Sequence, residues 1–144
     1  MPTEDDVVET VGTGSPFAET VTEPEATSLA FAPIWVNYDS LPAHSPVSGI
    51  SMRSFTGGQL MLNWVAFQPH QVVPRHQHPH EQAGIMLQGS LTLTIGDETR
   101  QVTPGDGYAI PPHLPHGAVA GPDGCLVLDV FTPPREDYRL PSED

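Results

Sequence analysis

The chain has 144 residues, the length of one domain, and carries 18 acidic residues against five arginines and no lysine, for a formal charge of −13. The arginines are scattered, so the sequence offers no basic stripe for a nucleic-acid backbone, which argues against such a partner. A single cysteine, Cys125, excludes an internal disulfide, and no apolar run reaches the roughly 18 residues that a membrane span needs.

Residues 1–28 hold seven acids and no base among Thr, Pro and Gly, a composition too polar to offset the entropy of ordering. We therefore expect a flexible acidic arm at residues 1–28, a folded domain at residues 29–138 and a short acidic tail at residues 139–144. The acidic start of the chain is the reverse of a signal peptide's basic start, so we expect a cytoplasmic protein with no membrane partner.

Beyond the arm, short apolar or alternating segments follow one another between clusters of glycine and proline. The segments with strand character lie at residues 34–38, 50–55, 59–67, 72–82, 83–87, 91–95, 99–102, 108–110 and 125–132. Turns are expected between them, among others at residues 88–90 and 121–124. No window shows a sustained helical period, and 17 prolines and 13 glycines are spread along the chain. The pattern predicts an all-β sandwich or barrel in a single domain.

The stretch from Arg75 to Gln82 concentrates potential metal ligands. His76, His78 and Gln82 stand at even spacings, and side chains two and four apart in an extended strand point to the same face. Neutral imidazole is the commonest protein ligand for transition metals, so a His-x-His pair makes half a site. A lone pair of this kind is more often only a pair of exposed strand residues, so the metal interpretation depends on its neighbours.

Two segments together resemble the two sequence motifs of the cupin superfamily. The first contains His76-x-His78, Gln82 and Gly89, and the second runs from Pro104-Gly105-Asp106 through Ile110-Pro111 to Pro115-His116. The resemblance covers residues 60–132 and implies a cupin double-stranded β-helix, a jelly-roll barrel. It also implies one divalent transition metal in the barrel mouth, with Ni, Zn, Fe and Mn not distinguished. The implied ligands are His76, His78, Gln82 and His116.

The sequence departs from the cupin pattern at three positions. His70 stands where the first motif has glycine, Ala120 where the second has asparagine, and Gln82 where the first has glutamate. With Gln82 every ligand is neutral, so the ion would keep its double charge and act as a stronger Lewis acid. Glu81 is the competing ligand, but it points to the other face of a strand. His80 and His113 are expected at the rim of the site.

The end of the domain, residues 128–138, resembles the KdgF family, small single-domain cupins of pectin and alginate breakdown. This resemblance implies that Asp129, Phe131 and Arg135 line the metal pocket, and Asp129 and Phe131 do share a strand face. Asp129 would act as a general acid or base, or alternatively bond to an arginine or a loop amide. Arg135 would bind a substrate carboxylate, or alternatively pair with Glu136 or Asp137.

The resemblance implies a metal-dependent ring opening and tautomerisation of 4,5-unsaturated monouronates. Asp129 and Arg135 would be catalytic, and Phe131 and Arg135 would bind the substrate. Two alternatives stay open at this point: a metal-dependent cupin dioxygenase acting on a small enolisable substrate, and a cupin that binds a sugar or another small molecule without catalysis. In each case the expected partner is a small molecule, anionic or carbonyl-containing for the two enzymes.

The last predicted strand also bears on association. Leu126, Leu128 and Val130 lie on the face opposite Asp129, so this strand is apolar on both sides. An apolar outer face needs covering, and a homodimer would cover it.

Overall fold

The computed structural model describes residues 22–138, and the chain divides into two units, Met1–Ala32 and Pro33–Asp144. In the described part of the first unit, the 3-10 helix η2 (Ala26–Ser28) is closed by Ser28, whose backbone N–H and hydroxyl both donate to the carbonyl oxygen of Glu25 (2.9 and 2.7 Å). Most of the predicted arm and all of the predicted tail lie outside the described residues. No helix among the described residues is both long and apolar enough to cross a membrane.

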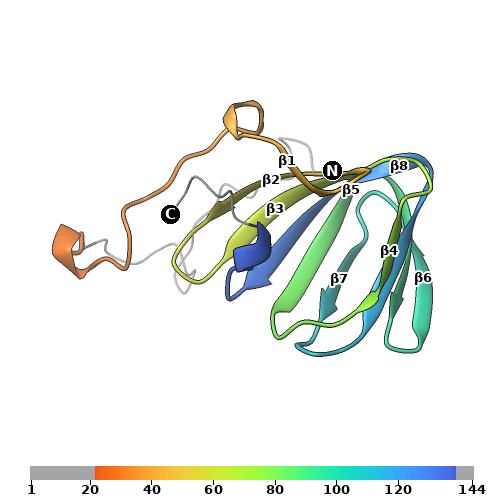
Figure 1. Cartoon of the computed structure of the whole chain (residues 1–144). Coiled ribbons are helices and arrows are strands. Elements are labelled where there is room, and N and C mark those ends of the chain that lie inside the picture. The colour runs from red at the N-terminus through yellow and green to blue at the C-terminus, as the bar shows by residue number, and fades with distance from the viewer. Residues whose placement is uncertain (1–21, 139–144) are drawn as a thin grey trace, which may run out of the picture. The chain divides into compact units, whose positions relative to one another are not determined.

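The second unit is an eight-stranded antiparallel sheet with short 3-10 helices (Figure 1). The strands are β1 (His44–Val47), β2 (Ile50–Thr56), β3 (Met61–Phe67), β4 (Val72–His76), β5 (Glu81–Ile95), β6 (Glu98–Val102), β7 (Gly107–Ile110) and β8 (His116–Thr132). The 3-10 helices are η3 (Tyr38–Ser40) and η4 (Glu136–Tyr138). The described residues contain no α-helix, and the prediction of an all-β fold is confirmed.

Strands β5 and β8 are the longest, and they pair with each other from end to end; we call this pair the β5–β8 ribbon. The sheet runs in the order β1-β2-β3-β8-β5-β6, and β4 also pairs with β8 and β7 with β5. At one end of the ribbon Gln82 stands opposite Phe131, and at the other Ile95 stands opposite His116. Strand β7 pairs along the Gln82 end and β4 along the His116 end, so each end is flanked by a further strand.

The predicted turns at residues 88–90 and 121–124 are wrong, because the ribbon runs through both positions. Gly89 stands opposite Cys125, and the register shifts on each side of Gly89. Gly89 (φ +79°) and Gly124 (φ +69°) lie in the left-handed region, which glycine enters without strain. A Cβ added at Gly89 would lie 2.1 Å from the carbonyl oxygen of Gly124. The two glycines therefore bend the ribbon without ending it.

The predicted strand at residues 34–38 is also wrong. Asn37 instead caps η3, its side-chain oxygen accepting the backbone N–H of Asp39 (2.9 Å). Trp35 is 93% exposed, so the apolar character of this segment does not reflect burial. Strand β1, by contrast, was not predicted, because Pro46 interrupts its sequence pattern. It lies at the edge of the sheet, where a strand tolerates proline.

The apolar core lies on the inner face of the middle of the ribbon. Its largest cluster comprises Met86, Leu91, Leu93, Val102, Ala120, Cys125 and Val127. Alternation along the strands produces this face: Leu91 and Leu93 are buried, and Thr92 between them is exposed. A second cluster, formed by Ile50, Met52 and Val65, joins β2 to β3.

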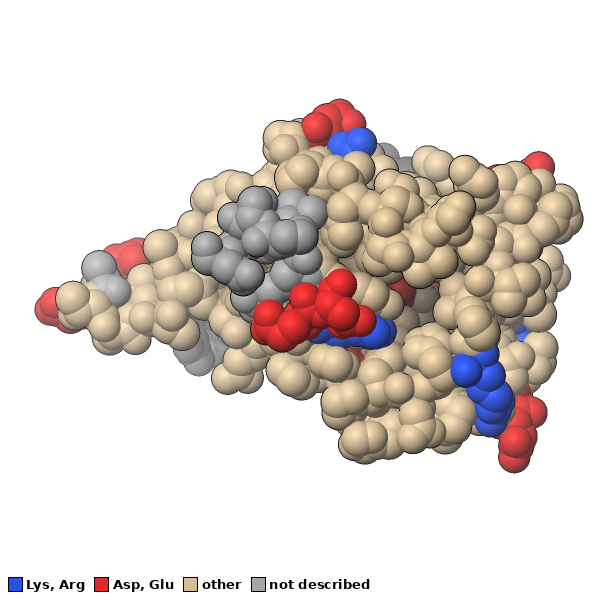
Figure 2. Space-filling model, viewed as in Figure 1, with Lys and Arg blue, Asp and Glu red and all other residues tan. Residues whose placement is uncertain are grey.

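The outer face of the sheet is apolar and partly exposed. Leu126, Leu128 and Val130 are half-buried, and Ile85, which stands opposite Leu128, is 51% exposed. Figure 2 shows the opposite side of the molecule, on which η4 lies and where the few charged side chains are scattered. The apolar outer face is compatible with the predicted homodimer, which stays a prediction.

Candidate metal centre

Three histidines from separate segments meet beside the ribbon. His76 ends β4, His116 begins β8 directly opposite it, and His78 lies in the connection that follows β4. Their ligand nitrogens all lie within 4.8 Å of one another. His78 and His116 are buried, with 6% and 4% of their surface exposed. The structure thus brings together three of the four predicted metal ligands in a geometry that could hold one ion.

His76, His78 and Gln82 do not lie on one strand. We predicted that His76, His78 and Gln82 share one face of a single strand, but β4 ends at His76 and β5 begins only at Glu81. Pro79 lies in the intervening turn and interrupts the pleat. The carbonyl oxygen of His78 accepts the backbone N–H of His113 (2.8 Å), which holds the turn against the segment before β8.

All three imidazoles are oriented in the same way. Each Nδ1 donates to a backbone carbonyl two positions away: His76 to Pro74 (2.8 Å), His78 to His80 (3.0 Å) and His116 to Leu114 (2.8 Å). A carbonyl oxygen only accepts, so the proton lies on Nδ1 and the Nε2 lone pair is left for the site. Hydrogen bonds of this kind fix ring orientation and tautomer in metal-binding histidines.

The donor set fits a bound cation. Nε2 of His116 is buried without a hydrogen-bond partner. Nε2 of His78 lies 3.1 Å from Oε1 of Gln82, so two acceptors face each other, an arrangement that a shared cation would satisfy. Burial, with a contribution from Arg135, lowers the pKa of His78 to about 4, and burial also lowers that of His116. Both rings are therefore neutral near pH 7, the form that binds metal.

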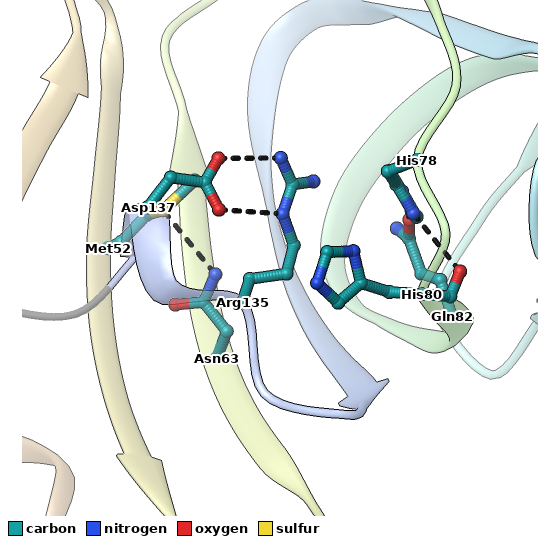
Figure 3. A network of polar contacts seen from close by, with 7 residues as sticks. All are labelled: Met52, Asn63, His78, His80, Gln82, Arg135 and Asp137. Carbon is teal, nitrogen blue, oxygen red and sulfur yellow. Dashed lines mark hydrogen bonds and ion pairs between the residues drawn. The ribbon is translucent and has the colours of Figure 1, made fainter.

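Gln82 rather than Glu81 faces the cluster, because alternation along β5 buries Gln82 and exposes Glu81. Gln82 is 8% exposed and Glu81 is fully on the solvent side of β5. His80 does not belong to the cluster, although its ring lies 5.3 Å from that of His78 and its Nδ1 is buried without a partner. Figure 3 places His80 between Arg135 and the pair formed by His78 and Gln82.

Asp129 lies at the other side of Gln82 and is buried, with 8% of its surface exposed. The Tyr108 hydroxyl donates to its Oδ1 at 2.6 Å. Burial raises the pKa of Asp129 to about 6, although hydrogen bonds from Tyr108 and Gln82 oppose the rise. The alternative partners considered from the sequence, an arginine or a loop amide, are thus replaced by a tyrosine and the Gln82 side chain.

Arg135 pairs with Asp137, one of the two alternatives drawn from the sequence. Its Nε and Nη2 lie 3.1 and 2.7 Å from the two carboxylate oxygens, a bidentate arrangement drawn in Figure 3. The guanidinium also lies 5.4 Å from the ring centre of Phe131 and 4.0 Å from that of Tyr138. The Arg135 side chain is 12% exposed and that of Asp137 is 59% exposed, so Asp137 lies on the solvent side of the pair.

One cavity of about 370 Å³ connects these groups. Its walls include His76, His116, Gln82, Asp129, Phe131 and Arg135, which are six of the seven residues predicted for the site. The seventh, His78, joins through its contact with Gln82. A small polar molecule entering the cavity would therefore meet a cation-binding cluster, a buried carboxylate and a guanidinium together.

Sequence reasoning missed two polar residues of this cavity. Tyr108 was placed only within the predicted strand 108–110, and Asn63 was not singled out, although it is fully buried. Asn63 accepts from the Ser54 hydroxyl (3.1 Å) and contacts the Met52 sulfur (3.4 Å, Figure 3). For Asn63 the available signal was a polar residue at an inward-facing position of β3. For Tyr108 only the register of β7, β5 and β8 reveals its partner, Asp129.

Comparisons with known proteins agree with this architecture. The family model described as cupin domain matches residues 63–131. The solved structure of KdgF from Halomonas sp. is 32% identical, with a TM-score of 0.69, and the match covers 76% of this chain and 100% of that chain. The pectin degradation protein KdgF of Dickeya dadantii is 29% identical over 102 residues, 69% of this chain and 93% of that protein.

A further relative differs in length. H2HPP isomerase of Bacillus subtilis is 41% identical over 105 residues, or 65% of this chain, but the match spans only 43% of the isomerase. The barrel fold, the histidine cluster and the full coverage of the Halomonas KdgF structure lead to one conclusion. The chain belongs to the cupin domain family and resembles KdgF within it.

Proposed function

We propose that this protein is a metal-dependent cupin that opens the ring of 4,5-unsaturated monouronates and tautomerises the product. The observation that carries the proposal is the single cavity in which the histidine cluster, Asp129 and Arg135 converge. The likeness to two KdgF proteins supports the choice of substrate class. A cavity of about 370 Å³ suits one small molecule, such as a single sugar, rather than a polymer.

The chemistry of the site divides among its residues. His76, His78, Gln82 and His116 would hold one divalent metal ion, which supplies Lewis acidity toward a substrate oxygen. Arg135 would seat the uronate carboxylate, in competition with Asp137 for the same guanidinium. The Phe131 ring would pack against the sugar.

Asp129 is the residue that we assign to proton transfer. Its carboxylate forms part of the cavity wall, and no other carboxylate that lines the cavity is comparably buried. Asp137 also lines the cavity, but it is engaged by Arg135 and its side chain is 59% exposed. A general acid or base must reach the reacting group within about 3 Å, and a wall position permits this.

Two measurements test the proposal together. Elemental analysis of the purified protein should find one divalent metal ion per chain, and the absorbance of 4,5-unsaturated galacturonate or mannuronate should disappear faster with the protein present. His78→Ala should abolish both effects. His70→Asn is the matched control, because His70 is exposed and has a φ of +62°, which asparagine tolerates. One bound ion without any loss of absorbance would reject the uronate reaction.

The role of Asp129 has its own test. At saturating metal, Asp129→Ala should lose turnover of the unsaturated uronate while the ion stays bound. Unchanged turnover with the ion in place would remove Asp129 from the chemistry.

A second candidate is an isomerisation of a different substrate. Its support is the 41% identity to H2HPP isomerase, which exceeds the identity to either KdgF protein. The substrate of that isomerase should be assayed beside the uronates, and turnover of it alone would favour this candidate. Oxygen consumption with Fe(II) would instead select a dioxygenase, and tight sugar binding without product over hours would select a binding protein.

A further inference from the structure

The orientation of the Gln82 side chain requires an explanation. An amide group has nearly the same shape at both ends, but only its oxygen can bind a metal ion. Oε1 faces Nε2 of His78 at 3.1 Å. Asp129 lies two residues along β8 from Phe131, the partner of Gln82, and lines the same cavity, where hydrogen bonding by the Gln82 side chain lowers the Asp129 pKa. Because a carboxylate only accepts, Asp129 selects the orientation in which the nitrogen faces it and the oxygen faces the histidines.

Asp129 itself is held by Tyr108. Burial and the neighbouring carboxylate raise the pKa of Tyr108, so the hydroxyl keeps its proton and donates to Oδ1 of Asp129 at 2.6 Å. Tyr108 is mostly buried on β7 and reaches Asp129 on β8 across the intervening strand β5.

The residue between them on β5 is Gly84, which pairs with Tyr108 on one side and with Asp129 on the other. A Cβ at this position would lie 2.3 Å from the Tyr108 hydroxyl oxygen and 2.4 Å from Oδ1 of Asp129. The hydrogen bond crosses the strand because Gly84 leaves the space for it. Three strands in register thus contribute one residue each to the arrangement.

We propose that Tyr108 is a positioning residue: it fixes the Asp129 carboxylate, which in turn holds the Gln82 amide with its oxygen directed at the histidine cluster. This inference rests on the metal site of the proposed function. It also accounts for the departure from the cupin pattern noted in the sequence. Glutamate at position 82 would set a second carboxylate against Asp129, and two buried carboxylates in contact repel each other.

Co(II) is the probe for the first test, because its visible absorption responds to the ligands and their geometry. Tyr108→Phe removes one hydroxyl, and we expect it to bind Co(II) roughly 10-fold more weakly, the lower range for loss of an outer-shell partner. Its Co(II) spectrum should differ from that of the natural protein. Tyr38→Phe is the matched control, since Tyr38 packs on the aromatic ring of Trp64 at the outer face of the sheet. Natural affinity and spectrum in Tyr108→Phe would overturn the proposal.

A double-mutant cycle tests the second link of the proposal, between Asp129 and Gln82, and needs no change at Tyr108. In Asp129→Asn the side-chain oxygen can still accept from Tyr108, and the new amide nitrogen can donate to a glutamate at position 82. We therefore expect Gln82→Glu to strengthen Co(II) binding at least tenfold more when Asn stands at position 129 than when Asp does. An equal gain in both backgrounds would show that the two side chains are not coupled and would overturn the proposal.

These measurements need no substrate, so they separate this inference from the proposed reaction. If the natural protein binds Co(II) and turns over no uronate, the reaction is wrong, while Tyr108→Phe still tests the role of Tyr108 and the cycle still tests the coupling of Asp129 to Gln82. If the natural protein binds no Co(II), the metal site is wrong and this inference falls with it.

Discussion

The middle and the two ends of the β5–β8 ribbon have opposite interiors. In the middle, Met86, Leu91 and Val127 are at most 3% exposed and touch other apolar side chains. At the ends, Gln82 and His116 are buried almost as deeply but are polar. One pair of strands thus provides both the core and the site. Because polar groups are costly to bury without partners, their confinement to the ends leaves the middle free to supply stability.

The largest expected effect concerns metal binding at the His116 end. His116→Ala should weaken Co(II) binding by more than the roughly 100-fold that loss of an outer-shell partner costs at most, because a direct ligand is removed. Without metal, this variant should lose less stability than Met86→Ala, since the buried Nε2 has no partner and the ring gives up only its Nδ1 hydrogen bond to Leu114. Calorimetric unfolding with and without metal checks both statements. A large loss of metal-free stability would break the division between end and middle.

The middle of the ribbon should show the reverse pattern. Met86→Ala should lower the free energy of unfolding by about 2–5 kcal/mol, because it opens a cavity in a packed core. The variant should still bind Co(II) with natural affinity at a temperature where it is folded. Urea unfolding measures the first effect and metal titration the second. Leu87→Ala is the control: its side chain is 39% exposed and should cost much less.

The outer face of the same ribbon is a third region, and the next question is whether a second chain covers it. If a homodimer covers this face, light scattering should give twice the chain mass, and Ile85→Asp should shift the population toward the monomer. Ile85 is suited to this change because it is 51% exposed and stands opposite Leu128. A monomeric natural protein would contradict the predicted homodimer.

The smallest expected effect is the alkylation of Cys125, which measures whether the middle of the ribbon opens and requires no substitution. Burial, with a contribution from Asp129, raises the pKa of this thiol to about 12, and its side chain belongs to the core cluster. The thiolate is the reactive form, so iodoacetamide should leave the folded protein unmodified at pH 8 and still at pH 10. Mass spectrometry should find modification only after unfolding in urea. Rapid alkylation of the folded protein would indicate that the middle of the ribbon opens.

The sequence predicted most of the strands, because alternation is a local property. The segments 50–55 and 91–95 fall within strands of the structure, and 59–67 covers β3 with two extra residues at its start. Whether neighbouring segments belong to one continuous strand was not predictable in the same way. Gly89 was expected to end a strand, and only its position opposite Cys125 shows that it bends one.

The site residues were likewise predicted from local sequence patterns, whereas the contacts between them were not. Its histidines and Gln82 were predicted from motif spacing that resembles the cupins, whereas the parity argument failed at Pro79. The hydrogen bond between Tyr108 and Asp129 was invisible, because nothing in the sequence records that β7 and β8 flank the same glycine. Likewise, the pairing of Arg135 with Asp137 was one of two alternatives that spacing alone did not decide.

The placement of ligands at both ends of the ribbon has a consequence for folding. His78 and His116 are far apart in the sequence, and they meet only when the ribbon has paired and bent, so an unfolded chain offers no comparable site. A metal ion that binds only the folded form stabilises that form by mass action, by about 2.7 kcal/mol when the free ion concentration is 100 times the Kd. An ion held by these histidines would act as a clip across a long chain closure, a stabilising role that a chain with one cysteine cannot give to an internal disulfide.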